Sequence, residues 1–343
     1  MKKVLYSLIL VLLIISVISC SSTAKGSAEG PKGKIVIYTS MYEDVLEELN
    51  WTLKRQFPDC HIELAYGGTG QIQSKVTTET AAKKLGCDML MVADPSYSLE
   101  LKEKGMLHPY ISKSAGTLAF DYDEDGYWYP VRVDNMILAF NPEKFSRQSL
   151  PNSFYDFAYD SNLRGAISMS NPLTSGTTMA AVTALLDKYG LGYFDALSRQ
   201  NVAIESGAVA LAKLEAGEYK LVMILEELIL QKRQQEMSKL EVIYPSDGTI
   251  MIPSTIMTVA AKWSANNNTA AAETITDWFL SPEGQNSIVD GWMHSVRKNF
   301  RKIPFDSQPT NHIQSNSMPL NWENSLRQRD SIQTMIENFL ANR

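Results

Sequence analysis

Short apolar runs alternate with longer amphipathic stretches from residue 34 onward. The apolar runs have the length and composition of buried strands, and the stretches between them have helical spacing. The first half of the chain predicts strands at 35–38, 61–66 and 88–93, and helices at 43–57, 71–85 and 97–104. Strands and helices that repeat in this order predict a parallel sheet covered on both faces, with ligands at the carboxyl ends of the strands.

The alternation resumes after residues 127–140, which have the pattern of two extended segments. The second series predicts a strand at 165–169, a helix at about 176–189, a strand at 219–224 and a helix that begins at Glu226. Extended runs at 240–244 and 255–261 then return the chain to the first unit. We therefore predict two doubly wound α/β domains joined by a two-strand hinge.

The first domain is expected to comprise residues 33–135 plus 250–343, and the second residues 136–249. The C-terminal third predicts helices at 269–280, 282–292 and about 322–340. One face of the last helix is apolar and carries Ile332, Met335, Ile336, Phe339 and Leu340. That spacing predicts a helix docked on the body of the protein, or alternatively a helix that binds a partner.

The N-terminus predicts export. Two lysines precede an apolar run, residues 4–18, that ends at Ser19 and Cys20. A run of about 15 residues is shorter than the roughly 20 that a membrane-spanning helix needs, so a retained anchor is the weaker alternative. The motif resembles a bacterial lipoprotein signal, which implies removal of residues 1–19 and a lipid on the Cys20 sulfur. Small and polar residues make 20–32 a flexible tether.

Charge and composition narrow the function further. Loss of two lysines with the signal changes the formal charge from −6 to −8, which does not suit nucleic acid. Cys60 and Cys87 remain, and the sequence leaves open whether they form a disulfide in the oxidising compartment. The four histidines show no metal-ligand spacing.

Turns that combine glycine with hydroxyl residues follow several predicted strands and open predicted helices. The amide groups of a helix N-terminus can hold an anion, and Ser or Thr adds further donors. The alternative is ordinary N-capping. The turns supply as ligand-binding candidates Ser40, Met41, Tyr42, Thr69, Gly70, Ser175, Gly176, Thr177, Thr178 and Ser206.

Three carboxylates lie at predicted strand ends: Glu226 and Glu227 after the strand at 219–224, and Asp94 after the strand at 88–93. Each is a candidate ligand contact, although acidic residues are also common in the first turn of a helix. The sequence contains no Gly-x-Ser-x-Gly elbow and no His-Glu-x-x-His motif. We therefore expect a binding protein without enzymatic activity and without a cofactor.

Taken together, these segments resemble the type II periplasmic binding proteins of the ferric-iron, phosphonate, thiamine and sugar-phosphate group. The segments that carry the resemblance are 35–40, 67–70, 171–177, 215–219 and 277–285. The resemblance implies a monomer whose two domains close on a small solute and deliver it to an ABC permease driven by a separate ATPase. It also implies an extracytoplasmic protein, held at the membrane by its lipid anchor.

The resemblance leaves two ligand classes. Iron-binding members use an adjacent tyrosine pair, where this sequence has Glu226 and Glu227, with Tyr42 about where their histidine lies and Asp94 about where their glutamate lies. Members that bind phosphorylated solutes use turns that match Ser40, Thr69–Gly70 and 175–177. A small organophosphate or phosphonate is therefore the preferred ligand, and ferric iron held by Tyr42, Asp94, Glu226 and Glu227 is the alternative. A secreted hydrolase is a weaker third hypothesis.

Overall fold

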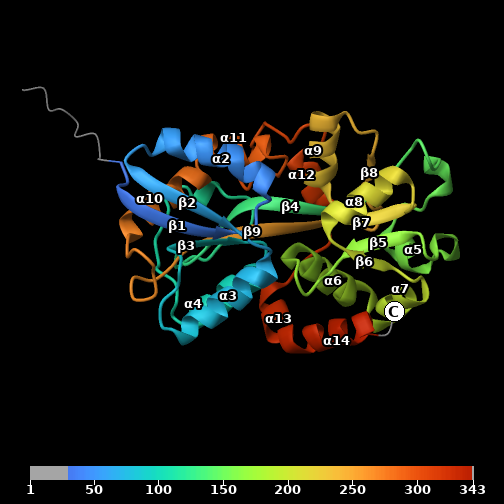
Figure 1. The fold of residues 1–343 in the computed structure, drawn as a ribbon, viewed down its shortest axis with the longest axis horizontal. Helices are drawn as coiled ribbons and strands as arrows, with labels where there is room; N and C mark the ends of the chain where they lie inside the picture. Colours follow the sequence, from blue (N-terminus) through green and yellow to red (C-terminus); the bar gives the residue numbers. More distant parts are fainter. Residues whose placement is uncertain (1–29, 342–343) are drawn as a thin grey trace, which may run out of the picture.

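The computed structural model describes residues 30–341, and the order of its elements follows the predicted α/β alternation (Figure 1). The predicted signal peptide, Cys20 and most of the tether lie outside the described residues. Within residues 30–341, no helix combines the length and the apolar character that a membrane-spanning segment needs.

The first lobe is built on the parallel strands β1 (Gly33–Thr39), β2 (Cys60–Tyr66) and β3 (Met89–Val92). The helices that follow these strands are α2 (Glu43–Gln56), α3 (Thr69–Ala81) and α4 (Pro95–Glu103). Alternate residues of β1 face opposite sides of the sheet: Ile35 packs with α2, and Val36 packs with α3 and α4. The sheet is therefore covered on both faces, as the apolar strands predict.

The second lobe repeats this plan. Its parallel strands are β5 (Ile167–Ser170), β6 (Ala203–Glu205) and β7 (Leu221–Leu225). Its helices are α5 (Phe154–Tyr159), α6 (Gly176–Tyr189), α7 (Leu191–Arg199), α8 (Gly207–Ala216) and α9 (Glu226–Glu236). One core joins α5, α6 and α7 to the sheet, and another joins α8 and α9 to its other face.

Two long antiparallel strands join the lobes. Strand β4 (Tyr129–Phe140) pairs with β9 (Ile250–Thr258) along its first part and with β7 along its last part. Strand β9 also pairs with β3 of the first lobe, and the strand order across the sheet is β2-β1-β3-β9-β4-β7-β5-β6. Every residue of β4 and β9 is buried.

The joining strands correct two details of the prediction. Residues 127–140 were expected to form two extended segments, but β4 is one strand, with a register shift between Pro130 and Arg132. Proline lacks the N–H that a regular ladder requires, which accounts for the irregular pairing there. The short strand β8 (Glu241–Ile243) stays beside β4, so β9 alone returns the chain to the first lobe.

The C-terminal segment also differs from its prediction. After α10 (Thr269–Leu280), α11 (Pro282–Asp290) and α12 (Thr310–Ser315), the expected helix at 322–340 is divided into α13 (Trp322–Arg327) and α14 (Arg329–Ala341). The predicted docking of its apolar face is confirmed, because Ile332, Ile336 and Phe339 are buried. They pack in the core of the second lobe, whereas the predicted boundary placed residues up to 343 with the first. Periodicity shows that a face is buried, but not which surface covers it.

The open question about the cysteines has a simple answer in this structure. Both Cys60 and Cys87 are buried and carry free thiols. Cys60 packs in the first-lobe core beneath α2, and Cys87 packs on the opposite face of the sheet with α3 and α4. The sheet itself therefore separates the two side chains.

Candidate functional site

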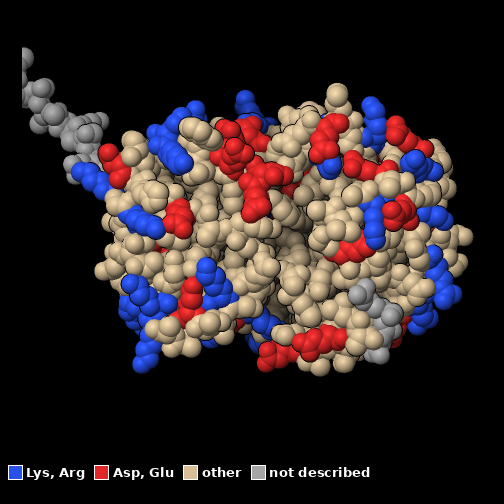
Figure 2. All heavy atoms as spheres, viewed as in Figure 1, with Lys and Arg blue, Asp and Glu red and all other residues tan. Residues whose placement is uncertain are grey.

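A polar cavity of about 480 Å³ lies between the two lobes, and Figure 2 shows the surface hollowed there. The first lobe lines it with Ser40, Tyr42, Tyr66, Gly68, Thr69, Gln71 and Ala93. The second lobe lines it with Ser170, Asn171, 174–177, 204–207 and Leu225. Strand β4 contributes Arg132 and Asp134, so the cavity combines groups from both lobes and from the strands that join them.

Three helices begin at the wall of the cavity: α3 at Thr69, α6 at Gly176 and α8 at Gly207. The amides of a first helical turn have no acceptor within their own helix, and the helix dipole places partial positive charge there. Two of these helices are also capped, because Ser175 Oγ accepts from Thr178 N at 3.2 Å and Ser206 Oγ accepts from Val209 N at 3.4 Å. Capping and ligand binding are compatible here, since one hydroxyl satisfies only one of the free amides.

A buried charge pair forms the floor of the cavity. Arg132 Nη1 donates to Asp134 Oδ1 at 2.6 Å, and Ser254 Oγ donates to Asp134 Oδ2 at 2.7 Å. Arg132 also reaches Ser40 Oγ at 3.4 Å. Both charged side chains are almost completely buried. Sequence reasoning missed this pair, although two charges within an otherwise apolar strand are a recognisable signal of a buried ion pair.

Glu227 and Tyr42 lie next to this pair. Burial is the largest cause that holds the pKa of Glu227 well above its usual range, and the Asp134 carboxylate raises this pKa further. The charge of Arg132 acts in the opposite direction and lowers it. The shift favours the protonated carboxyl, which can donate a hydrogen bond to Asp134. Burial and the carboxyls of Glu227 and Asp134 also raise the pKa of Tyr42. The floor of the cavity is therefore close to neutral, with Arg132 balanced by Asp134.

Glu226 does not line the cavity. Its carboxylate lies where α9 of the second lobe meets the first lobe at His294 and Ser307. Its carboxylate accepts hydrogen bonds from Asn135 Nδ2 at 2.7 Å, from Tyr244 Oη at 2.5 Å and from Ser307 Oγ at 2.6 Å. His294 Nε2 lies 3.0 Å from the same carboxylate. Burial alone would raise the pKa of Glu226, but the hydrogen bonds from His294, Ser307 and Tyr244 outweigh it and lower the pKa. The hydrogen-bonding capacity of this carboxylate is therefore used by protein groups rather than left for a ligand.

Asp94 is also held outside the cavity. It caps α4 by accepting from Tyr97 N at 3.2 Å, and it accepts from Gln73 Nε2 at 2.8 Å. Its remaining partners are Ser96 Oγ at 2.5 Å and the guanidinium of Arg329, a residue of α14, at 3.2 Å. A carboxylate with four donors around it has little capacity left for a ligand.

The structure therefore brings together part of the predicted site. The predicted residues that line the cavity are Ser40, Tyr42, Thr69, Ser175, Gly176, Thr177 and Ser206. Met41 lies in the first-lobe core, and Thr178 is buried behind the α6 N-terminus. The four residues proposed for iron do not converge, because Asp94 and Glu226 lie in separate networks. No group of three or more His, Cys, Asp or Glu residues within 30–341 is arranged to hold a metal ion.

Glycines allow the lobes to approach closely beside the cavity. A Cβ atom on Gly70 would lie 2.6 Å from the carbonyl oxygen of Leu173, and one on Gly176 would lie 2.7 Å from the Thr69 side chain. Gly70 and Thr69 belong to the first lobe, and Leu173 and Gly176 belong to the second. Real Cβ atoms do not approach a backbone oxygen so closely, so the contact between α3 and the loop before α6 requires glycine.

The fold and the interlobe cavity define a solute-binding protein of the kind that serves bacterial ABC transporters. Residues 87–324 match the family described as bacterial extracellular solute-binding protein, and the chain belongs to that family. Its members are binding proteins rather than enzymes. A comparison with curated protein sequences found no match.

Solved structures share the whole fold at low sequence identity. Iron-bound HitA from Pseudomonas aeruginosa has a TM-score of 0.77 and 18% identity, covering 89% of this chain and 99% of that one. AfuA from Actinobacillus pleuropneumoniae, with fructose-6-phosphate bound, has a TM-score of 0.75 and 19% identity, covering 91% and 98%. A periplasmic thiamin binding protein has a TM-score of 0.73 and 14% identity, covering 90% and 98%. The type II, two-domain α/β fold predicted from the sequence is confirmed.

The glycine contact predicts that Gly70→Ala separates the lobes. The added methyl group would overlap a backbone oxygen of the second lobe, so the lobes must move apart, while alanine itself suits the first turn of α3. We expect a larger radius of gyration in small-angle X-ray scattering and an unchanged or slightly higher melting temperature. Gly116→Ala is the control, because a Cβ there meets open space. An unchanged radius in Gly70→Ala would contradict the interpretation.

The Glu226 network predicts an acid-sensitive contribution to stability. Because the folded-state pKa of Glu226 lies below the ordinary value of 4.5, its contribution is complete above that pH and is lost as the pH falls through the folded pKa. Glu226→Gln should lower the free energy of unfolding at pH 7 by on the order of 3 kcal/mol. Urea unfolding at several pH values should show this difference shrinking below about pH 4.5. The exposed Glu48→Gln is the control, and a difference independent of pH would refute the assignment.

Proposed function

We propose that this protein binds a small phosphorylated or phosphonate anion in the interlobe cavity and delivers it to the permease of an ABC importer. The observation that carries the proposal is the convergence of the α3, α6 and α8 N-termini on one cavity. Helix N-termini hold phosphate groups through backbone amides and the helix dipole. The hydroxyls of Ser40, Thr69, Ser175 and Thr177 add donors around the same space.

The electrostatics of the cavity support an anion held by hydrogen bonds rather than by many cations. Among the described residues that line it, the guanidinium of Arg132 is the one cationic side chain, and Asp134 balances its charge. Preorganised amide donors therefore supply most of the attraction. Such donors lose little conformational freedom on binding, because the helices are already held by their lobes.

The volume and lining of the cavity support an organic ligand. About 480 Å³ lies within the range of pockets that hold small organic molecules. Gln71, Asn171 and Glu205 offer amide and carboxylate groups in addition to the hydroxyls. Groups of this kind can hydrogen-bond sugar hydroxyls at the far end of a phosphorylated solute.

Ferric iron is the second candidate, and one observation favours it. Tyr42 lines the cavity beside Asp134 and Glu227, which together provide oxygen donors suited to a hard cation. Iron-bound HitA, which shares the fold, is also a protein with iron in its structure. Iron binding would require deprotonation of groups whose pKa values burial raises, so it would release protons.

The cellular setting of the proposal rests on the N-terminal sequence. A lipid on Cys20 would tether the protein on the extracytoplasmic side of the membrane, and residues 20–32 would let it reach the permease. The protein would act as a monomer whose lobes close on solute about β4 and β9. Transfer of the solute then requires the permease and its ATPase, with no chemical step performed by this chain.

Thermal unfolding against a panel of solutes tests the ligand class. The panel consists of hexose phosphates, phosphonates, thiamine phosphates, inorganic phosphate and chelated ferric iron. The protein from Ser21 onward, refolded to remove carried-over ligand, should gain about 2.7 kcal/mol of stability from a ligand at a hundred times its dissociation constant. Stabilisation by a phosphorylated solute is the expected result. Stabilisation by iron alone would replace the proposal with the iron alternative.

The double variant Ser175→Ala, Thr177→Val should abolish that stabilisation, because both residues line the cavity at the α6 N-terminus. Loss of the Ser175 cap costs about 1 kcal/mol of basal stability by itself. Ser153→Ala is therefore the matched control. Ser153 Oγ caps α5 by accepting a hydrogen bond of 3.0 Å from Asp156 N, and Ser153 does not line the cavity. Full ligand-induced stabilisation in the double variant would contradict the proposed site.

A further inference from the structure

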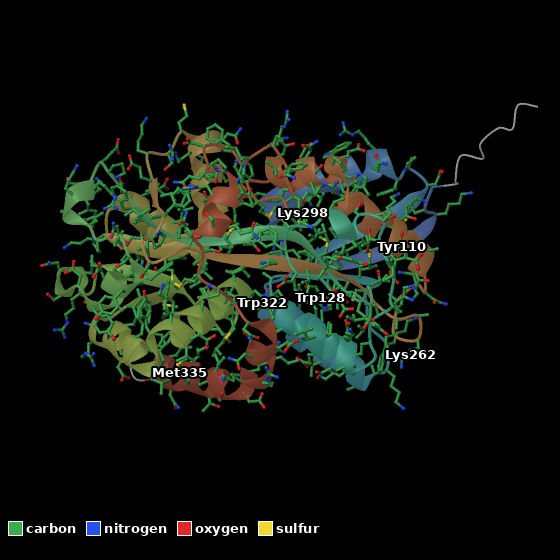
Figure 3. The ribbon with its side chains drawn as sticks, turned by 180° about the vertical axis from the view of Figure 1, so that it is seen from behind. Tyr110, Trp128, Lys262, Lys298, Trp322 and Met335 are labelled. Carbon is green, nitrogen blue, oxygen red and sulfur yellow. The ribbon has the colours of Figure 1, made fainter. Side chains whose placement is uncertain are left out.

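The C-terminal strap, defined as residues 320–341, crosses between the two lobes. In Figure 1 α13 lies at the bottom between the two lobes and α14 runs beneath the second lobe, and in Figure 3 Trp322 and Met335 mark their positions from behind. Helix α13 packs on α4 of the first lobe. The α14 residue Phe339 packs edge-on against Phe194 of the second lobe, with ring centroids 5.9 Å apart. The strap is thus a connection between the lobes in addition to β4 and β9.

One side chain concentrates the polar contacts of the strap. Arg329, the first residue of α14, forms an ion pair with Glu100 of α4. Its Nη2 donates to Ser96 Oγ at 2.7 Å and lies 3.2 Å from Asp94 Oδ2. The guanidinium also lies over the ring of Tyr97, 5.7 Å from its centroid. All four partners belong to the first lobe, whereas Ile332, one turn later in α14, is buried in the second.

The contacts of Arg329 lie directly behind the solute cavity. Asp94 follows Ala93, which lines the cavity, and it also accepts from Gln73 Nε2 of α3 at 2.8 Å. Helix α3 begins one turn earlier at Thr69, a residue of the cavity wall. Arg329 is therefore linked through a single carboxylate to the helix whose N-terminus faces the solute.

We propose that Arg329 is an interlobe latch, which holds the strap against the first lobe and favours the closed arrangement of the two lobes. When the lobes separate, α14 moves with the second lobe and must leave Asp94, Ser96 and Glu100 behind. This inference rests on the lobe movement of the proposed function, but it does not depend on which solute binds. It makes Arg329 a positioning residue for α3 rather than a solute contact.

The latch shares its response to salt with the partly exposed ion pair between Arg233 of α9 and Asp306, and it differs in this response from the contacts between the lobes that have an uncharged partner. Gln231 Nε2 donates to Asp44 at 3.1 Å, and Trp292 Nε1 donates to Gln234 at 2.7 Å; each of these contacts has an uncharged partner. Arg329 instead pairs with two carboxylates and is about a quarter exposed, with 26% of its side-chain surface accessible. Salt screens partly exposed ion pairs of this kind, so the latch should weaken as ionic strength rises.

Distance measurements between the lobes test the latch in ligand-free protein. Spin labels are attached to cysteines introduced at two exposed positions, Thr78 of α3 and Arg164 of the second lobe; Cys60 and Cys87 are buried. Arg329→Gln should raise the ratio of long-distance to short-distance molecules about threefold, as expected for loss of a partly exposed charge network. High salt should shift the wild-type distances in the same direction and should affect the variant less.

Three further variants make the result decisive. Arg327→Gln is the matched control, because Arg327 is 69% exposed and pairs with Glu323 of its own helix at 4.0 Å. Glu100→Gln removes the ion pair from the first-lobe side, and it serves as the test if Arg329→Gln does not fold. Gly70→Ala reports whether the lobes move at all. Longer distances in Gly70→Ala, with unchanged distances in both Arg329→Gln and Glu100→Gln, would overturn the latch but not the lobe movement.

Discussion

The structure depends on the antiparallel pair β4 and β9, which passes through the centre of the sheet and belongs to both lobes. These strands are buried along their whole length, so their residues must satisfy both cores at once. The buried pair of Arg132 and Asp134 lies on this shared element, where it forms the floor of the solute cavity. A buried ion pair is weak evidence for stability, but removing one partner is costly. The same two strands therefore fix the site and limit how the lobes can move.

In the proposed function, the cavity holds an anion without an excess of cationic side chains. Helix N-termini from both lobes aim amide donors at one space, and the charges of the floor nearly cancel. Glu227 is held toward its protonated form beside Asp134, which avoids a second negative charge next to the Asp134 carboxylate. Since α3 and α6 approach closely through Gly70 and Gly176, closing the lobes also brings their amides together. In the proposed function, these contacts couple lobe closure to solute binding.

The sequence predicted the fold well and the site only in part. Apolar strands and amphipathic helices are local patterns, so the α/β alternation, the hinge and the buried face of α14 could be read directly. Hydroxyl and glycine turns such as Ser175–Gly176 were found because strand ends share one edge of a sheet. The directions of Asp94 and Glu226 could not be read, since their partners Arg329 and His294 are distant in sequence. The docking surface of α14 was undetermined for the same reason.

Phosphorus NMR tests the central claim most directly, because it observes the proposed ligand group itself. Phosphorylated solutes are titrated with the protein from Ser21 onward, and the ³¹P resonances are followed. The account predicts that one solute shows a new, shifted resonance that saturates at one ligand per chain. It would be contradicted if every phosphorus resonance stayed unchanged while ferric iron bound and produced a tyrosinate-to-iron absorption band that Tyr42→Phe removes.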